Sequence, residues 1–437
     1  MSFRLVTVRM AWLVCTLRLG TICLAQDSPA PSRPGQHGVL TGRTEGLPTA
    51  VSPGNWSQSA KLTPGSGNFI FDFGTSVGIS GDTAIVNNLP SDANPAVAYV
   101  FHKSARGWSY TLPVARLSET AALNLSTAPL AIDGDTIVMG APSGYLGYPS
   151  YVFVYVKSAA GWTDMAPTAI LTPFDSDDGS FGASVSISGD TVVVGDLGGY
   201  GTLTSGAAYV FVKPATGWVN GTQTAKLTAS DVLPTDLFGE AVSVGGNTVA
   251  VGAPQGVAPG KAYVFVKPTT GWSDMTQTAL LTASDAQTGS EVGWSVSVSG
   301  DNVLVGAPSN TLNHPPGHAY LFTKPSSGWT NMTETAELLS ADGRSNDDFG
   351  YSVAIAGSVA AVGALGRGVT PFASEGGVYV FEEPAGGWQN MTGHVVLTGS
   401  DARYYALFGY SVGVSGKTVV GGTRALESFG AYVFGLP

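Results

Sequence analysis

Residues 181–228 read FGASVSISGDTVVVGDLGGYGTLTSGAAYVFVKPATGWVNGTQTAKLT and contain the unit from which most of the chain is built. Four short apolar runs alternate with turn residues in this stretch, a pattern typical of a small antiparallel sheet. Such a sheet cannot bury both of its faces alone, so copies of it must stack on one another. The stretch therefore predicts a repeat protein made of stacked four-stranded sheets.

The same unit recurs along the chain, and the glycine of its first hairpin marks each copy. These glycines are Gly81, Gly134, Gly189, Gly246, Gly300, Gly357 and Gly416. Their mean spacing is (416 − 81)/6, or about 56 residues. A period of this length is typical of a propeller blade. We therefore predict an all-β fold, a seven-bladed β-propeller of four-stranded antiparallel blades over residues 55–437.

The two ends of the array complement each other. The last copy, residues 408–434, supplies three apolar runs and no fourth. A matching fourth run, residues 60–63, stands before the first copy, and Leu62 precedes Phe73 by 11 residues, as in other copies. We predict that residues 58–63 add the outer strand to the last blade, which closes the ring and covers a sheet edge.

Residues 1–25 have the pattern of a secretory signal peptide. Arg4 and Arg9 precede an apolar run over residues 10–17, and a small residue stands before Gln26. Residues 26–54 are rich in Pro and Gly without a period, which is typical of a flexible linker. We therefore expect a secreted or cell-surface protein in which this linker precedes the propeller.

Composition limits the partners further. Loss of Arg4, Arg9 and Arg18 with the signal peptide would change the net charge from −11 to −14, which disfavours nucleic acid and anionic membranes as partners. Both cysteines, Cys15 and Cys23, would leave as well, so we expect no disulfide bond. No later run approaches the roughly 18 apolar residues of a membrane span. We expect a monomer.

Two motifs connect these copies to a known family. Phe-Gly opens five of the copies, and Gly-Ala-Pro follows the second run at residues 140–142, 252–254 and 306–308. This combination resembles the FG-GAP repeat of the integrin α-subunit propeller. The added Gly-Trp and Ala-Tyr-Val-Phe segments resemble the variant in secreted bacterial proteins. The resemblance implies a propeller fold, and it is compatible with adhesion, glycan recognition or scaffolding.

Calcium binding of the family's kind is not expected in the hairpins. Integrin blades carry an Asp-x-Asp-x-Asp-Gly loop there, whereas turns such as residues 188–191 are too short to supply the six to eight oxygen ligands of Ca²⁺. Acidic residues gather between the copies instead, and Asp175, Asp177 and Asp178 most resemble a metal loop. We expect no cofactor, and favour Asx turns and surface charge as the role of these residues. Calcium at these three carboxylates is the alternative.

The aromatic residues fall into two groups. The tryptophan of each Gly-Trp recurs at one position, so we expect it to pack in the core, although a sugar-stacking platform is the alternative. Ligand binding is more plausible for non-repeated residues in the loops between the second and third runs, where insertions collect on one face. These candidates are Tyr145, Tyr148, Tyr200, His314, His318 and Phe372.

No catalytic constellation is evident in the sequence. The five histidines occupy unrelated blade positions, and no Gly-x-Ser-x-Gly elbow stands beside a plausible base. We therefore expect a non-catalytic module that binds an extracellular protein or glycan at a loop face, in adhesion or recognition. The alternatives are a glycan-active hydrolase or lyase of propeller fold and a purely structural exoprotein.

Overall fold

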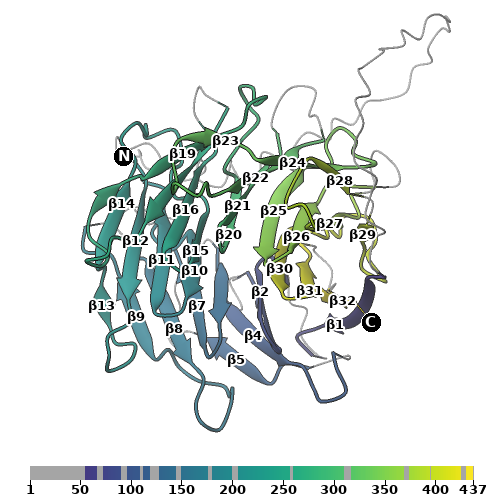
Figure 1. Ribbon diagram of the computed structural model, residues 1–437. Coiled ribbons are helices and arrows are strands. Elements are labelled where there is room, and N and C mark those ends of the chain that lie inside the picture. The colour runs from purple at the N-terminus through teal and green to yellow at the C-terminus, as the bar shows by residue number, and fades with distance from the viewer. Residues whose placement is uncertain are drawn as a thin grey trace, which may run out of the picture. The chain divides into compact units, whose positions relative to one another are not determined.

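The computed structural model describes residues 55–65, 72–89, 96–108, 112–118, 127–143, 149–175, 180–198, 205–255, 259–309, 316–368, 374–393, 395–424 and 430–436. Within these ranges the regular structure is entirely β-strand, arranged in seven sheets (Figure 1). No helix in the described ranges could span a membrane. The predicted signal peptide and linker lie outside the described residues.

Four antiparallel strands in chain order form each of the first four blades. Blade 1 contains β2 (Val77–Ser80), β3 (Thr83–Asn88), β4 (Val97–His102) and β5 (Ala115–Ser118). Blade 2 contains β6 (Leu130–Asp133), β7 (Thr136–Ala141), β8 (Tyr151–Val156) and β9 (Ala169–Thr172). Blade 3 contains β10 (Ser184–Ser188), β11 (Thr191–Asp196), β12 (Ala207–Val212) and β14 (Ala225–Thr228). Blade 4 contains β15 (Val242–Gly245), β16 (Thr248–Ala253), β17 (Lys261–Val266) and β19 (Ala279–Thr282).

The remaining three blades follow the same order, and the last takes one strand from the N-terminal side. Blade 5 contains β20 (Ser295–Ser299), β21 (Asn302–Ala307), β22 (His318–Thr323) and β24 (Ala336–Ser340). Blade 6 contains β25 (Phe349–Ala356), β26 (Val359–Ala364), β27 (Gly377–Glu382) and β29 (Val395–Leu397). Blade 7 contains β30 (Ser411–Ser415), β31 (Thr418–Gly422), β32 (Ala431–Gly435) and β1 (Ser57–Leu62).

The first strand of every blade lies at the centre of the ring. Each contacts the first strand of the next blade, in the order β2, β6, β10, β15, β20, β25 and β30, and β30 contacts β2. Figure 1 shows these strands inside and outer strands such as β5, β9 and β29 towards the periphery. The predicted seven-bladed propeller is confirmed.

The predicted closure by the N-terminal strand is also confirmed. β1 pairs antiparallel with β32, with Leu62 opposite Ala431, and Leu62 is fully buried. Figure 1 shows the purple β1 beside β32 near the C-terminus. The Trp56 indole donates a hydrogen bond to Glu382 Oε1 (3.1 Å), so the residue before this strand also contacts blade 6. Blade 7 therefore joins segments from both ends of the described chain.

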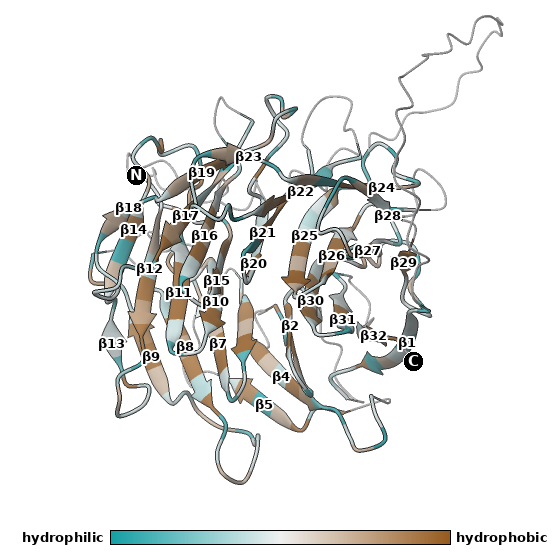
Figure 2. Ribbon diagram, viewed as in Figure 1, coloured by the Kyte–Doolittle hydropathy of each residue, from teal (hydrophilic) through white to brown (hydrophobic). Residues whose placement is uncertain are grey.

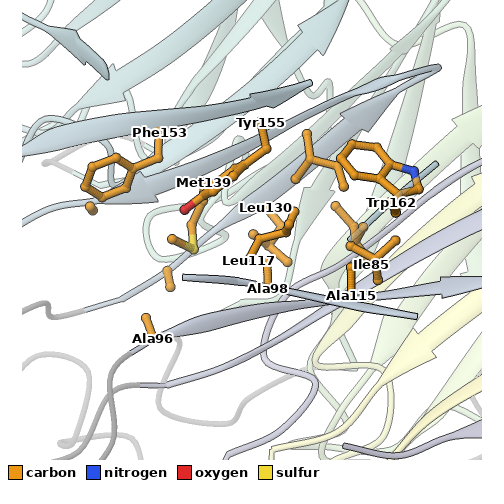
Figure 3. Packing of buried hydrophobic residues seen from close by; sticks show 14 residues of the cluster. Ile85, Ala96, Ala98, Ala115, Leu117, Leu130, Met139, Phe153, Tyr155 and Trp162 are labelled. Atoms are coloured by element: carbon orange, nitrogen blue, oxygen red, sulfur yellow. The ribbon is translucent and has the colours of Figure 1, made fainter. Parts of the chain in front are cut away.

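Seven clusters of buried hydrophobic residues hold the blades together, each between two neighbours. Between blades 1 and 2, Figure 3 shows Tyr155 and Trp162 gathered with Ile85 and Leu117. Hydrophobic residues line the strands that face these clusters, as on β4, β9 and β12 in Figure 2. The repeated tryptophans pack here as expected, and five of them are buried: Trp162, Trp218, Trp272, Trp329 and Trp388.

The Phe-Gly and Gly-Ala-Pro parts of the repeated motif meet across most blade interfaces. A Cβ on Gly306, in the second strand of blade 5, would lie only 2.0 Å from the carbonyl oxygen of Gly350 in blade 6. Gly350 itself has a φ of +94°, a region that side chains disfavour. The Phe-Gly of one blade therefore requires the glycine of Gly-Ala-Pro in the blade before it.

One interface departs from this rule and compensates for it. Blade 2 lacks Phe-Gly, and blade 1 carries Asn87 in place of the second-strand glycine. Asn87 is buried, and its Nδ2 donates a hydrogen bond to the Ala128 carbonyl (2.7 Å). Its Oδ1 accepts hydrogen bonds from Thr75 Oγ1 (3.0 Å) and the Ser76 amide (2.6 Å). An asparagine side chain thus fills the space left by the missing motif.

The outer edge has two features that the repeat pattern did not predict. The tryptophan of each Gly-Trp lies in the connection from the third strand, ahead of the fourth strand and outside it. Four sheets also gain a short parallel strand from the following repeat, and these are β13 (Gly221–Thr222), β18 (Met275–Thr276), β23 (Met332–Thr333) and β28 (Met391–Gly393). They cover an edge that would otherwise be exposed.

Candidate functional site

The two ends of the blades differ in their connections. At one end, which we call the turn end, the first two strands are joined by two-residue turns. At the other, the loop end, lie the connections between the second and third strands and those from each blade to the next. Of the candidates from the sequence, Asp175 and His318 lie at the loop end. The others lie outside the described residues: Tyr145, Tyr148, Asp177, Asp178, Tyr200, His314 and Phe372.

Three aromatic residues form a row at the loop end of the inner strands. Trp294, Tyr351 and Tyr410 each follow the glycine of the Phe-Gly position, in blades 5, 6 and 7. The ring centroids of Trp294 and Tyr351 are 5.5 Å apart, and those of Tyr351 and Tyr410 are 5.1 Å apart. All three are partly exposed. We call them the axial aromatic row, because they stand at the start of three adjacent strands of the inner ring.

Two charged side chains lie next to the Tyr410 end of the row. The Arg424 guanidinium lies 5.3 Å from the centroid of the Tyr410 ring, and its Nη1 donates a hydrogen bond to the Tyr410 hydroxyl (3.2 Å). Arg424 Nε also lies 3.9 Å from Asp72 Oδ1 of blade 1. Burial raises the pKa of Asp72 above its ordinary value, against the opposing effect of Arg424. Aromatic rings, a cation and a carboxylate therefore follow one another across four adjacent blades.

The position after the Phe-Gly pair is not aromatic in the other blades that have this pair. Blades 1, 3 and 4 have Thr75, Ala183 and Glu240 directly after the Phe-Gly pair. The sequence analysis expected ligand-binding residues in the variable loops. It did not predict this row, because the members of the row lie inside the repeat itself. A comparison of the residue after Phe-Gly between copies would have found it, since three consecutive copies are aromatic there.

A second set of side chains ties the connections between blades to the third strands. In blade 4, the Tyr263 hydroxyl donates a hydrogen bond to Asp231 Oδ1 (2.8 Å), and Lys261 Nζ lies 2.7 Å from Asp231 Oδ2. Burial alone would raise the pKa of Asp231, but the hydrogen bonds from Lys261 and Tyr263 outweigh it and lower the pKa. Burial and Asp231 together raise the pKa of Tyr263 far above its ordinary value. These contacts hold the connection against the blade.

The two described sequence candidates belong to this set. Asp175 Oδ2 lies 2.7 Å from Lys226 Nζ, so a cationic side chain already neutralises this carboxylate. His318 Nδ1 lies 2.6 Å from Glu337 Oε1, and its ring stacks on Tyr320 with centroids 5.7 Å apart. The bond to Glu337 raises the pKa of His318, against the opposing effect of burial. Asx turns and surface charge stay the predicted role of Asp175, Asp177 and Asp178, with calcium as the alternative.

The asparagines of three Asn-x-Thr sequences have a structural contact at the outer edge. The side-chain oxygens of Asn220, Asn331 and Asn390 accept hydrogen bonds from backbone amides of the preceding blade's fourth strand, at 2.8–2.9 Å. Asp274 accepts the equivalent bond from the Lys226 amide (2.8 Å). Because Asp serves equally well here, edge contact explains these residues without glycosylation.

Comparison with known proteins agrees with the geometry. A model of the FG-GAP repeat matches residues 56–101, 166–211, 222–265, 275–322 and 332–381, more than half of the 437 residues. Each matched segment ends in the third strand of a blade, and three of them open in the short parallel strand before a fourth strand. A repeat therefore spans two adjacent blades. No curated protein matches the chain.

Proposed function

The chain belongs to the FG-GAP repeat family, and on that premise we propose that it is a secreted propeller that binds a glycan at its loop end without cleaving it. Secretion is supported by the signal-like pattern of residues 1–25. The observation that carries the binding proposal is the axial aromatic row.

The row has the chemistry that a sugar chain requires. Aromatic faces pack against the apolar faces of sugar rings, while tyrosine hydroxyls, a guanidinium and a carboxylate form hydrogen bonds with sugar hydroxyl groups. Trp294, Tyr351 and Tyr410 succeed one another at 5.1–5.5 Å, so together they offer a surface longer than a single ring. An extended glycan fits this arrangement better than a single small molecule.

The charged neighbours favour binding over cleavage. Glycoside hydrolysis generally needs two carboxyl groups about 5 to 9.5 Å apart on either side of the bond. Asp72 is a carboxylate that joins the row through Arg424, and it lies beside that guanidinium. That arrangement suits the orientation of a ligand rather than proton transfer to a leaving group.

A glycan array probed with the purified protein tests the proposal. We expect a discrete set of oligosaccharides to bind, and the Trp294→Ala and Tyr351→Ala variants to bind them more weakly. An aromatic stacking contact contributes on the order of 1 kcal/mol, so each variant should bind about five-fold more weakly. Tyr404→Ala is the matched control, because Tyr404 is a 63% exposed tyrosine outside the row.

Two results would contradict this function. Release of reducing sugar from any bound glycan would make the protein an enzyme. Equal binding by the parent, the row variants and Tyr404→Ala would place the binding surface elsewhere.

A further inference from the structure

The carboxylates at the blade connections are usually matched with a cationic side chain. In four blades an aspartate lies within 2.7 Å of a lysine or arginine nitrogen, in the pairs Asp175–Lys226, Asp231–Lys261, Asp342–Arg367 and Asp401–Lys61. In each of these blades a tyrosine of the third strand also contacts the aspartate: Tyr209, Tyr263, Tyr379 and Tyr432. The cationic group thus always lies beside the aspartate, although it comes from a different strand or connection in different blades.

Blade 5 keeps the aspartate and the tyrosine but changes the residues at the cation positions. Glu337 pairs with Tyr320 across β24 and β22, as Lys226 pairs with Tyr209 in blade 3. His318 opens β22 as Lys261 opens β17. A carboxylate and an imidazole therefore occupy the two positions from which lysines neutralise the aspartate in other blades.

We propose that Asp285, His318 and Glu337 bind one divalent transition-metal ion, with Zn²⁺ as the best match. Each residue offers a ligand atom, and these atoms all lie within 4.8 Å of one another. A tetrahedral Zn²⁺ takes imidazole nitrogen and carboxylate oxygen at about 2.0–2.2 Å, so binding requires these three side chains to rotate towards a common point. Imidazole favours zinc over calcium and magnesium, which prefer oxygen ligands alone.

The neighbouring tyrosine supports this site. The Tyr320 hydroxyl donates a hydrogen bond to Asp285 Oδ1 (2.9 Å), and its ring stacks on the His318 imidazole. Both contacts restrict the orientation of a ligand, as outer partners do in metal sites. The ion would join the connection from blade 4 to the two outer strands of blade 5, where lysine or arginine makes that link in other blades.

Titration of the untagged, chelator-treated full chain with ZnCl₂ by isothermal calorimetry tests the site. We expect one Zn²⁺ to bind per chain, with no competition from an excess of Ca²⁺ or Mg²⁺. Titration with Co²⁺ should produce the visible absorption of a four-coordinate ion. Tyr320→Phe should weaken Zn²⁺ binding by about 10- to 100-fold, the usual effect of losing an outer partner.

Two variants remove the site in different ways. Glu337→Lys restores the lysine of blades 3 and 7, so the blade should stay folded while Zn²⁺ binding disappears. Glu337→Gln keeps the shape of the side chain and should weaken binding without a change in far-UV circular dichroism. The matched control is Asp231→Asn in blade 4, which removes an equivalent carboxylate beside Lys261 and should leave binding unchanged.

A gain of binding is the most demanding test. Lys261→His combined with Leu280→Glu copies the blade 5 residues into blade 4 beside Asp231, so the stoichiometry should rise from one ion to two. Absence of Zn²⁺ binding by the parent chain, or binding that Glu337→Lys leaves intact, would overturn the proposal. Failure of glycan binding would leave it standing, because the metal readout does not involve the axial aromatic row.

Discussion

The blade interior and the loop-end surface lie within a few residues of each other on β25, and their residues vary differently between copies. Phe349 and Gly350 belong to the interior of the blade stack, where Phe349 is fully buried and packs edge-on against Tyr379 at 5.2 Å. The next residue, Tyr351, belongs to the loop-end surface and stands in the axial aromatic row. Residues that recur in most copies thus hold the blades together, whereas the loop-end residue beside them differs between copies.

The difference follows from what each region contacts. An interior residue meets similar neighbours at most blade interfaces, so one solution serves most copies, and Asn87 replaces it between blades 1 and 2. A loop-end residue meets solvent or a ligand, so each copy can carry another side chain without disturbing the stack. The following predictions test this division, from the largest expected effect to the smallest.

Removal of β1 should give the largest loss, because this strand completes the interior between blades 7 and 1. Burial of Leu62 stabilises the fold by roughly 1.5 to 3 kcal/mol, and each ladder hydrogen bond adds about 0.5 to 1.5 kcal/mol. A chain that begins at Pro64 should therefore melt earlier and aggregate, whereas one that begins at Val51 should not. Differential scanning calorimetry of both chains measures this, and equal melting would refute the closure.

Substitution of adjacent residues of β25 should separate stability from binding. Phe349→Ala should destabilise the protein by about 3 to 5 kcal/mol, because a cavity remains in the interior. Tyr351→Ala removes a partly exposed ring and should destabilise the protein by less than half as much, while glycan binding weakens about five-fold. Urea denaturation measures the first effect and the glycan array the second. Similar losses of stability in both variants would contradict the division.

Added methyl groups should distinguish the interior from an exposed turn on a smaller scale. Gly306→Ala places Cβ 2.0 Å from the Gly350 carbonyl oxygen, so the interface must shift, at a typical cost of about 1 to 3 kcal/mol. Gly386→Ala is the control, since no atom lies within 4 Å of its Cβ position. That variant should be neutral in urea denaturation. Tolerance of Gly306→Ala would mean that the interface is looser than its geometry indicates.

Acid should act on the loop-end network more weakly. Burial would raise the pKa of Asp401, but hydrogen bonds from Lys61 and Tyr432 outweigh it and lower the pKa. A lowered carboxyl pKa stabilises the folded state above the ordinary value of about 3.9, and this contribution disappears as pH falls through the lower folded value. The effect should stay below about 1 kcal/mol, because Asp401 is exposed to solvent.

The Lys61→Met variant tests the direction of this change of stability with pH. The variant should lose less stability than the parent between pH of about 5 and about 3, since its Asp401 pKa lies closer to the ordinary value. Urea midpoints at the two pH values provide the measurement. A steeper loss in the variant would contradict the role of the lysine.

The sequence alone determined the architecture of this protein. The recurring hairpin glycines, the Phe-Gly pairs and the spacing of Leu62 before Phe73 were enough to predict seven blades and their closure. These features are readable because each depends on residues within one repeat, and the repeat is copied. Even the expected burial of Trp162 and its equivalents followed from recurrence at one position.

Only the tertiary structure decided which side chains meet across repeats. Trp294, Tyr351 and Tyr410 are more than 50 residues apart in sequence and become neighbours because the inner strands of blades 5 to 7 stand side by side. Asp285 and His318 likewise meet Glu337 through the pairing of β22 with β24. The short parallel strands were unpredictable for the same reason, since their partners belong to another repeat. Sequence spacing records neighbours along the chain, whereas contacts between blades depend on the stacking of whole sheets around the ring.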